Sequence, residues 1–135
     1  MTPGATSSTP TFREVSVVVV DGEVVGWNEG GGAYVPDSPT TWSLLWAHRT
    51  NHLVVAHTHP GKGAPFPSHE DLTTFAAVEA ALGREVDWLI ASADVLVRVE
   101  LVDVHRPVTR VVLLPPGLGG PPWLAELRAR SWRLS

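Results

Sequence analysis

The fold is decided by the stretch EVSVVVVDGEVVGW, which occupies residues 14–27. Two apolar, largely β-branched runs flank the pair Asp21-Gly22, and an Asp-Gly pair between two such runs is typical of a tight β-hairpin turn. The first run is far shorter than the roughly 20 residues that a membrane-spanning helix needs. We therefore expect the chain to begin its sheet with a buried hairpin.

Beyond the hairpin, helical and strand patterns alternate. A helix that starts at Asp37 or Ser38 and runs to about His48 carries Trp42, Leu45, Trp46 and Arg49 at helical spacing, and we expect the apolar face that they form to pack on the sheet. The other expected elements are strands at 52–58, 87–92, 95–102 and 108–114 and helices at 68–82 and 123–132. This order, ββαβαβββα, predicts an α/β (mixed α+β) fold with a central mixed β-sheet flanked by helices.

Length and composition restrict the architecture and the partners. A chain of 135 residues is the size of one domain, so we expect a flexible arm at 1–12 and a single domain at 13–135. The start of the chain lacks the basic and apolar segments of a signal peptide, which predicts a cytoplasmic protein without a membrane partner. A net charge of −4 disfavours nucleic acid, and the absence of cysteine excludes disulfides and thiolate chemistry.

The chemistry of the chain is concentrated in the stretch HTHPGKGAPFPSHED, residues 57–71. Residues two apart on a strand share a face, so His57 and His59 can direct two imidazoles at one point, whereas His52 faces the other way. The Gly/Pro-rich loop can bring Asp71, in the first turn of the next helix, close to the end of that strand. Two imidazoles and one carboxylate with an open fourth position are the ligand set of a catalytic zinc, so we expect a Zn²⁺ site.

Ser68 stands three residues before Asp71 and has two interpretations. The Ser-x-x-Asp spacing is typical of a helix N-cap with an acidic residue in the first turn. The hydroxyl could equally serve a catalytic site, and both roles are compatible.

This segment resembles the JAMM (JAB/MPN) metalloprotease family, whose pattern is a Glu on an early strand, then His-x-His-Pro, then Ser-x-x-Asp. The resemblance covers residues 14–92 and implies His57, His59 and Asp71 as zinc ligands and Ser68 as a donor to the oxyanion. It also implies an upstream Glu as general acid/base, for which Glu14 is the best match and Glu23 and Glu29 are competitors. The implied function is cleavage of peptide or isopeptide bonds at the C-terminal Gly of a ubiquitin-like protein.

Two departures and two alternatives accompany this resemblance. The loop between His59 and Ser68 is one residue longer than the usual pattern. The 13 residues before Glu14 leave little room for an N-terminal helix, so we expect one sheet face to be bare or covered by a partner. The alternatives are a non-catalytic MPN-type interaction module and a RadC-like DNA-associated domain.

Trp123 and Trp132 near the end of the chain suggest a protein interface, with a partner protein or a second copy.

Overall fold

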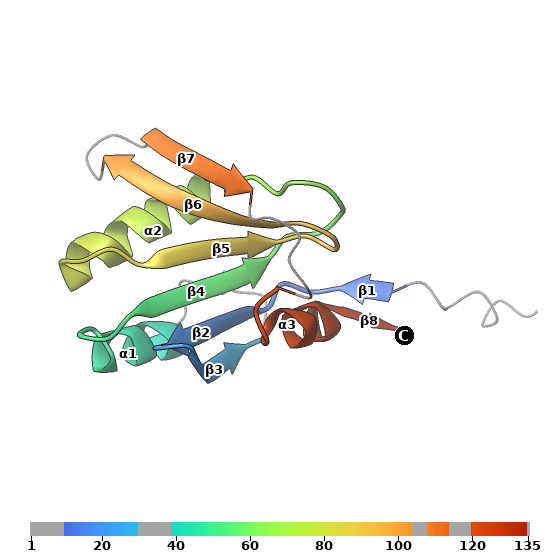
Figure 1. Cartoon of the computed structure of the whole chain (residues 1–135), viewed down its shortest axis with the longest axis horizontal. Helices are drawn as coiled ribbons and strands as arrows, with labels where there is room; N and C mark the ends of the chain where they lie inside the picture. Colours follow the sequence, from blue (N-terminus) through green and yellow to red (C-terminus); the bar gives the residue numbers. More distant parts are fainter. Residues whose placement is uncertain (1–9, 30–38, 104–107, 114–119, 135) are drawn as a thin grey trace, which may run out of the picture.

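The computed structural model describes residues 10–29, 39–103, 108–113 and 120–134 (Figure 1). The elements in chain order are β1 (Pro10–Phe12), β2 (Ser16–Val20), β3 (Glu23–Asn28), α1 (Pro39–Ala47), β4 (Leu53–Thr58), α2 (His69–Leu82), β5 (Asp87–Ala91), β6 (Leu96–Asp103), β7 (Val108–Leu113), α3 (Leu124–Ser131) and β8 (Trp132–Leu134). The glycine-rich stretch 30–32, the expected helix cap at Asp37 or Ser38 and residues 114–119 lie outside the described residues.

Six of the strands form one mixed sheet in the order β3-β2-β4-β5-β6-β7 (Figure 1). β4 and β5 run parallel, with α2 as their crossover, and the other neighbouring pairs are antiparallel. The hairpin of β2 and β3 turns at Asp21 and Gly22, which both have positive φ angles, 50° and 85°, as a tight type I′ turn requires. The predicted mixed sheet with flanking helices is confirmed.

Each face of the sheet has its own apolar core. Val18, Val55 and Ile90 pack on one face with Leu45 of α1 and Phe75 of α2. The side chains that alternate with these along the strands point to the other face. There Val15, Val17 and Ala56 pack against Leu124 and Leu127 of α3. The run of valines in β2 is buried on both sides because helices cover both faces of this strand.

Helix α1 meets the sheet with only part of the face that was expected. Trp42 and Trp46 remain 36% and 46% exposed and stack on each other, whereas Leu45 is buried. Leu44 packs so closely over Gly26 of β3 that a Cβ on Gly26 would lie 2.4 Å from its Cδ1 atom. The missing side chain at Gly26 therefore lets the leucine side of α1 approach the sheet. The expected packing is confirmed for Leu45 and wrong for Trp42 and Trp46.

The two ends of the described chain correct four further expectations. Helix α3 covers the sheet face that was expected to be bare, and Trp123 is buried in the core beneath it rather than exposed at an interface. Pro10–Phe12 is not part of a flexible arm, because it forms β1 and pairs antiparallel with β8 (Figure 1). Trp132 begins β8 instead of ending the helix, and its ring packs 5.0 Å from that of Phe12.

None of the helices in the described part of the chain combines the length and the apolar character that a bilayer crossing requires.

Candidate metal centre

Two imidazoles meet where β4 ends. His57 and His59 lie on the same side of the chain, and their Nε2 atoms are 3.2 Å apart. His57 is fully buried, whereas the side chain of His59 is 21% exposed. His52 points elsewhere and pairs with Asp87 at 2.7 Å on the surface. The two nitrogens therefore form a pair that solvent reaches from the His59 side.

The third member of the group, Asp71, comes from the first turn of α2. Its Oδ1 atom lies 3.4 Å from Nε2 of His57, and its Oδ2 atom lies 3.1 Å from Nε2 of His59. The ligand atoms of these three residues all lie within 4.8 Å of one another, which makes them a candidate metal site among the described residues. The parallel pairing of β4 with β5 requires α2 to cross back over the sheet, and the crossover brings its first turn to the end of β4.

A capping box fixes the position of Asp71. The backbone N–H of Asp71 donates to Oγ of Ser68 at 3.0 Å, and the backbone N–H of Ser68 donates to Oδ2 of Asp71 at 2.8 Å. The cap interpretation of Ser68 is confirmed. Because the cap uses a lone pair of Oγ, the hydroxyl proton is still available to donate.

Burial controls the protonation of the three side chains. It lowers the pKa of His57 to about 3, helped by the neighbouring His59, and it also lowers the pKa of His59. Burial raises the pKa of Asp71 to about 6, although the N–H of Ser68 opposes this effect. Both imidazoles are therefore neutral at pH 7, which is the form that binds a metal ion.

Glu14 lies beside this group, two residues before the start of β2. The Cα partner of Ser16 is His57, and the backbone N–H of Thr58 donates to the carbonyl of Val15, so the same register places Glu14 opposite His59. Burial, together with the negative charges of Asp71 and Glu70, raises the pKa of Glu14 to about 7. A carboxylate with this pKa can exchange a proton near neutral pH.

The two competing carboxylates lie elsewhere. Glu23 is exposed at the turn end of β3, where it pairs with Val20 at the far end of the hairpin. Glu29 accepts a hydrogen bond from the guanidinium of Arg13 at 2.8 Å. Glu14 is the candidate carboxylate that the register places opposite His59.

The loop between His59 and Ser68 is held by residues that the sequence did not single out. The side chain of Asp94 accepts the N–H of Gly63 at 2.8 Å, and Oγ of Ser92 donates to the carbonyl of Gly63 at 2.6 Å. The Nε atom of Arg128, on α3, donates to the carbonyl of Ser92. These bonds join the loop to the turn between β5 and β6. The only sequence signal for them was the turn-forming character of residues 92–94.

Buried polar atoms without partners gather at this site. In the described part of the chain, five buried side-chain atoms make no hydrogen bond: Glu14 Oε1, Ser16 Oγ, His57 Nδ1, Asp71 Oδ1 and Arg98 Nε. Four of these atoms lie at the candidate site: two belong to His57 and Asp71, and two belong to Glu14 and Ser16 on the neighbouring segment. Buried polar atoms without hydrogen bonds require an explanation. A zinc ion, which takes nitrogen and carboxylate ligands, fits this donor set and would use the free Oδ1 of Asp71.

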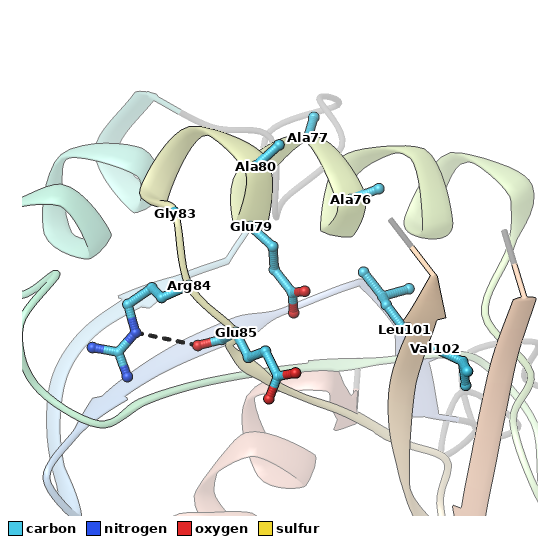
Figure 2. A pocket seen from close by; sticks show the side chains of 9 residues that line it. All are labelled: Ala76, Ala77, Glu79, Ala80, Gly83, Arg84, Glu85, Leu101 and Val102. Carbon is cyan, nitrogen blue, oxygen red and sulfur yellow. Dashed lines mark hydrogen bonds between the residues drawn. The ribbon is translucent and has the colours of Figure 1, made fainter. Parts of the chain in front are cut away.

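A separate cleft of about 690 Å³ lies near the C-terminal end of α2 (Figure 2). It lies between α2 and β6, where the Glu79 side chain points from the helix toward the sheet. That carboxylate accepts hydrogen bonds from Trp88 Nε1 and from the backbone of Val86. None of the three candidate metal ligands lines this cleft.

A mixed sheet with two histidines at the end of one strand, and a capping aspartate at the start of the following helix, defines a JAB/MPN-type domain. A model of the family described as prokaryotic homologs of the JAB domain matches residues 13–105, and the chain belongs to this family. The resemblance drawn from the sequence is thereby confirmed. Comparison with curated proteins and with solved structures gave no match.

Proposed function

We propose that this protein is a zinc-dependent hydrolase that cleaves peptide or isopeptide bonds. The observation that carries the proposal is the convergence of His57, His59 and Asp71 within 4.8 Å, with Glu14 beside them. Two neutral imidazoles and one carboxylate would hold the ion and leave one position open. A zinc ion there would lower the pKa of a water molecule to about 7 and polarise the carbonyl to be attacked.

Glu14 is the proposed general base and acid. Its carboxylate takes a proton from the attacking water as the water oxygen bonds to the carbonyl carbon. It later gives this proton to the amine nitrogen as the C–N bond breaks, so the proton is conserved over the reaction. The pKa of about 7 suits both transfers, and the orphaned Oε1 atom has a hydrogen-bond site to offer to water.

Ser68 is the proposed donor to the oxyanion. The capping box uses Oγ as an acceptor, so the hydroxyl proton can point away from the helix toward the negative charge that develops on the carbonyl oxygen. The cap also fixes Oγ relative to Asp71, so that the donor is positioned before the substrate arrives.

The proposed substrate is a ubiquitin-like protein, or its conjugate, cut after its C-terminal Gly. This proposal rests on membership in the JAB family and on the loop beside the site. Hydrogen bonds from Ser92 and to Asp94 anchor that loop, yet the side chain of Phe66 stands 71% exposed two residues before Ser68. A rigid loop that presents an apolar ring beside the reacting groups is suited to form a wall for an extended substrate tail.

A cleavage assay tests the proposal. The probe is a set of prokaryotic ubiquitin-like proteins, each extended beyond its terminal Gly by a reporter peptide, incubated with zinc-loaded protein. We expect cleavage that a chelator stops and zinc restores, with a loss of about 10²- to 10⁴-fold in Glu14→Gln.

Glu23→Gln is the matched control, because it changes an exposed carboxylate on the same hairpin and should leave the rate unchanged. A wild-type protein that binds zinc but cleaves none of these fusions would favour the non-catalytic interaction module. Equal rates in wild type and Glu14→Gln would remove Glu14 from the mechanism.

A further inference from the structure

Ser16 is a buried hydroxyl that the proposed mechanism does not use. It is 1% exposed, and its Oγ atom has no hydrogen-bond partner in the part of the chain that the structure describes. It opens β2 and is the Cα partner of His57 on β4. Side chains of directly paired residues on antiparallel strands project from the same face, with Cβ atoms about 5 Å apart. The hydroxyl of Ser16 and the imidazole of His57 are therefore neighbours.

Like Ser16 Oγ, the second ring nitrogen of His57 lacks a hydrogen-bond partner among the described residues. Nε2 faces Asp71 and His59, whereas Nδ1 is buried and makes no hydrogen bond with any described residue. A histidine that binds a metal through Nε2 carries its proton on Nδ1, and this N–H nearly always donates to a neighbouring acceptor. Without an acceptor, neither the tautomer nor the ring orientation of His57 is determined.

The other neighbours of His57 offer no acceptor side chain. Ile90 is its partner on β5, Phe75 packs edge-on against its ring at 5.9 Å, and Val55 precedes it on the same face of β4. All three are apolar, so Ser16 is the polar side chain among these described neighbours. A serine in this position of a strand otherwise made of valines has a reason to be there.

We infer that Ser16 is a positioning residue whose Oγ accepts the Nδ1–H of His57. Rotation about χ1 of Ser16, or one buried water between the two atoms, completes the bond without any movement of the backbone. The bond fixes the proton on Nδ1 and leaves the lone pair of Nε2 directed at Asp71 and His59. The effect on zinc rests on the proposed function, whereas the effect on the tautomer concerns the metal-free protein as well.

The test compares Ser16→Ala with Ser16→Thr, which keeps the hydroxyl. Val18→Ala is the matched control, because it trims a buried side chain on the same face of β2 without removing a polar group. Two quantities are measured for each protein. Long-range ¹H–¹⁵N NMR correlations give the His57 tautomer with and without zinc, and competition with a chelator gives the zinc dissociation constant.

We expect wild type and Ser16→Thr to hold the proton on Nδ1 and to bind zinc with similar affinity. Ser16→Ala should show mixed tautomers and bind zinc about 10- to 100-fold more weakly. Val18→Ala should unfold at a lower urea concentration but keep the wild-type tautomer and affinity. If Ser16→Ala keeps both the Nδ1 proton and the wild-type affinity, the inference is wrong.

A wild-type protein that binds no zinc would overturn the proposed function instead. In that case the tautomer of metal-free His57 still decides the role of Ser16. A single Nδ1–H form that is lost in Ser16→Ala would support it, and an unchanged form would refute it.

Discussion

Replacing the candidate ligand Asp71 by Asn should stabilise the metal-free protein at neutral pH. The Asp71 side chain is completely buried, and its Oδ1 atom accepts no hydrogen bond. Burial raises the pKa of Asp71 from its ordinary value of 3.8 to about 6, so the ionised form is held in the protein at a cost. Asn has nearly the same shape and keeps an oxygen for the N–H of Ser68, but it carries no charge.

The size of the effect follows from the pKa. The difference between 3.8 and about 6 corresponds to about 3 kcal/mol, at about 1.4 kcal/mol for each pKa unit. The substitution also loses the attraction between a negative charge and the N-terminus of α2, which is worth about 0.5 to 1 kcal/mol. We therefore expect the free energy of unfolding of Asp71→Asn to exceed that of the wild type by about 2 kcal/mol at pH 7.

The free energy of unfolding should depend on pH in a definite direction. Because the pKa of Asp71 is higher in the folded than in the unfolded chain, the folded state binds the proton more tightly. The free energy of unfolding of the wild type then falls as the pH rises from 3.8 to about 6, and the loss is complete above that range. The difference between variant and wild type should be small below pH 4 and largest above pH 6.

Urea unfolding in the presence of a chelator, from pH 3.5 to pH 8, measures this difference directly, because the other titrating groups are common to both proteins. With excess zinc the order should reverse, since only the wild type gains the binding free energy of the ion. A variant that is less stable than the metal-free wild type at pH 7, or a difference that does not change with pH, would refute the reasoning.

Three further outcomes are expected. In the metal-free protein, NMR titration of Glu14 should give a pKa of about 7, and zinc should lower it because the ion offsets the charge of Asp71; a pKa near 4.5 without zinc would contradict the site geometry. Gly26→Ala should cost about 1 kcal/mol in urea unfolding, since Leu44 must rotate away from the added methyl, and it should leave zinc affinity unchanged; a loss of affinity would argue against separate roles for α1 and the site. Gly83→Ala should cost about 1 kcal/mol because Gly83 ends α2 with a φ of 71°, and an unchanged stability would show that the helix can end in another way.

Local patterns explain what the sequence predicted well. The Asp21-Gly22 turn needs two positive φ angles, and few residue pairs other than such Asp-Gly or Asn-Gly pairs accept them. The end of α2 and its cap depend on Ser68, Asp71 and Gly83, which act within one or two turns of the helix. Alternation along β4 placed His57 and His59 on one side. In each case the interacting residues are close in sequence, so their spacing carries the information.

Contacts between distant segments explain what the sequence did not predict. The pairing of Pro10–Phe12 with Trp132–Leu134 joins two three-residue strands from opposite ends of the chain, and neither is long enough to show a strand pattern. The orientation of α1 depends on the missing side chain of Gly26 on another element, so the periodicity of the helix placed Leu45 correctly but not Trp42 and Trp46. Helix α3 is short, and its role in covering the second sheet face follows from the topology rather than from its own residues.

At the candidate site, too, local spacing was predictable from the sequence, whereas contacts between distant segments were not. The chemical type of the candidate ligands was evident from the spacing of two histidines and one aspartate. The positions of Glu23 and Glu29 were not, because they depend on the direction of β3 and on an ion pair with Arg13. The anchoring of the loop by Asp94 was also invisible, since a turn residue becomes a loop anchor only when the sheet brings the two segments together.

The central claim is that His57, His59 and Asp71 hold one zinc ion, and elemental analysis of untagged protein purified with zinc tests it most directly. Wild type should contain about one zinc per chain, and Asp71→Ala should contain essentially none. Glu70→Ala, which removes an exposed carboxylate from the same turn of α2, should bind as much zinc as the wild type. A wild-type protein without zinc, or equal zinc in wild type and Asp71→Ala, would contradict the account.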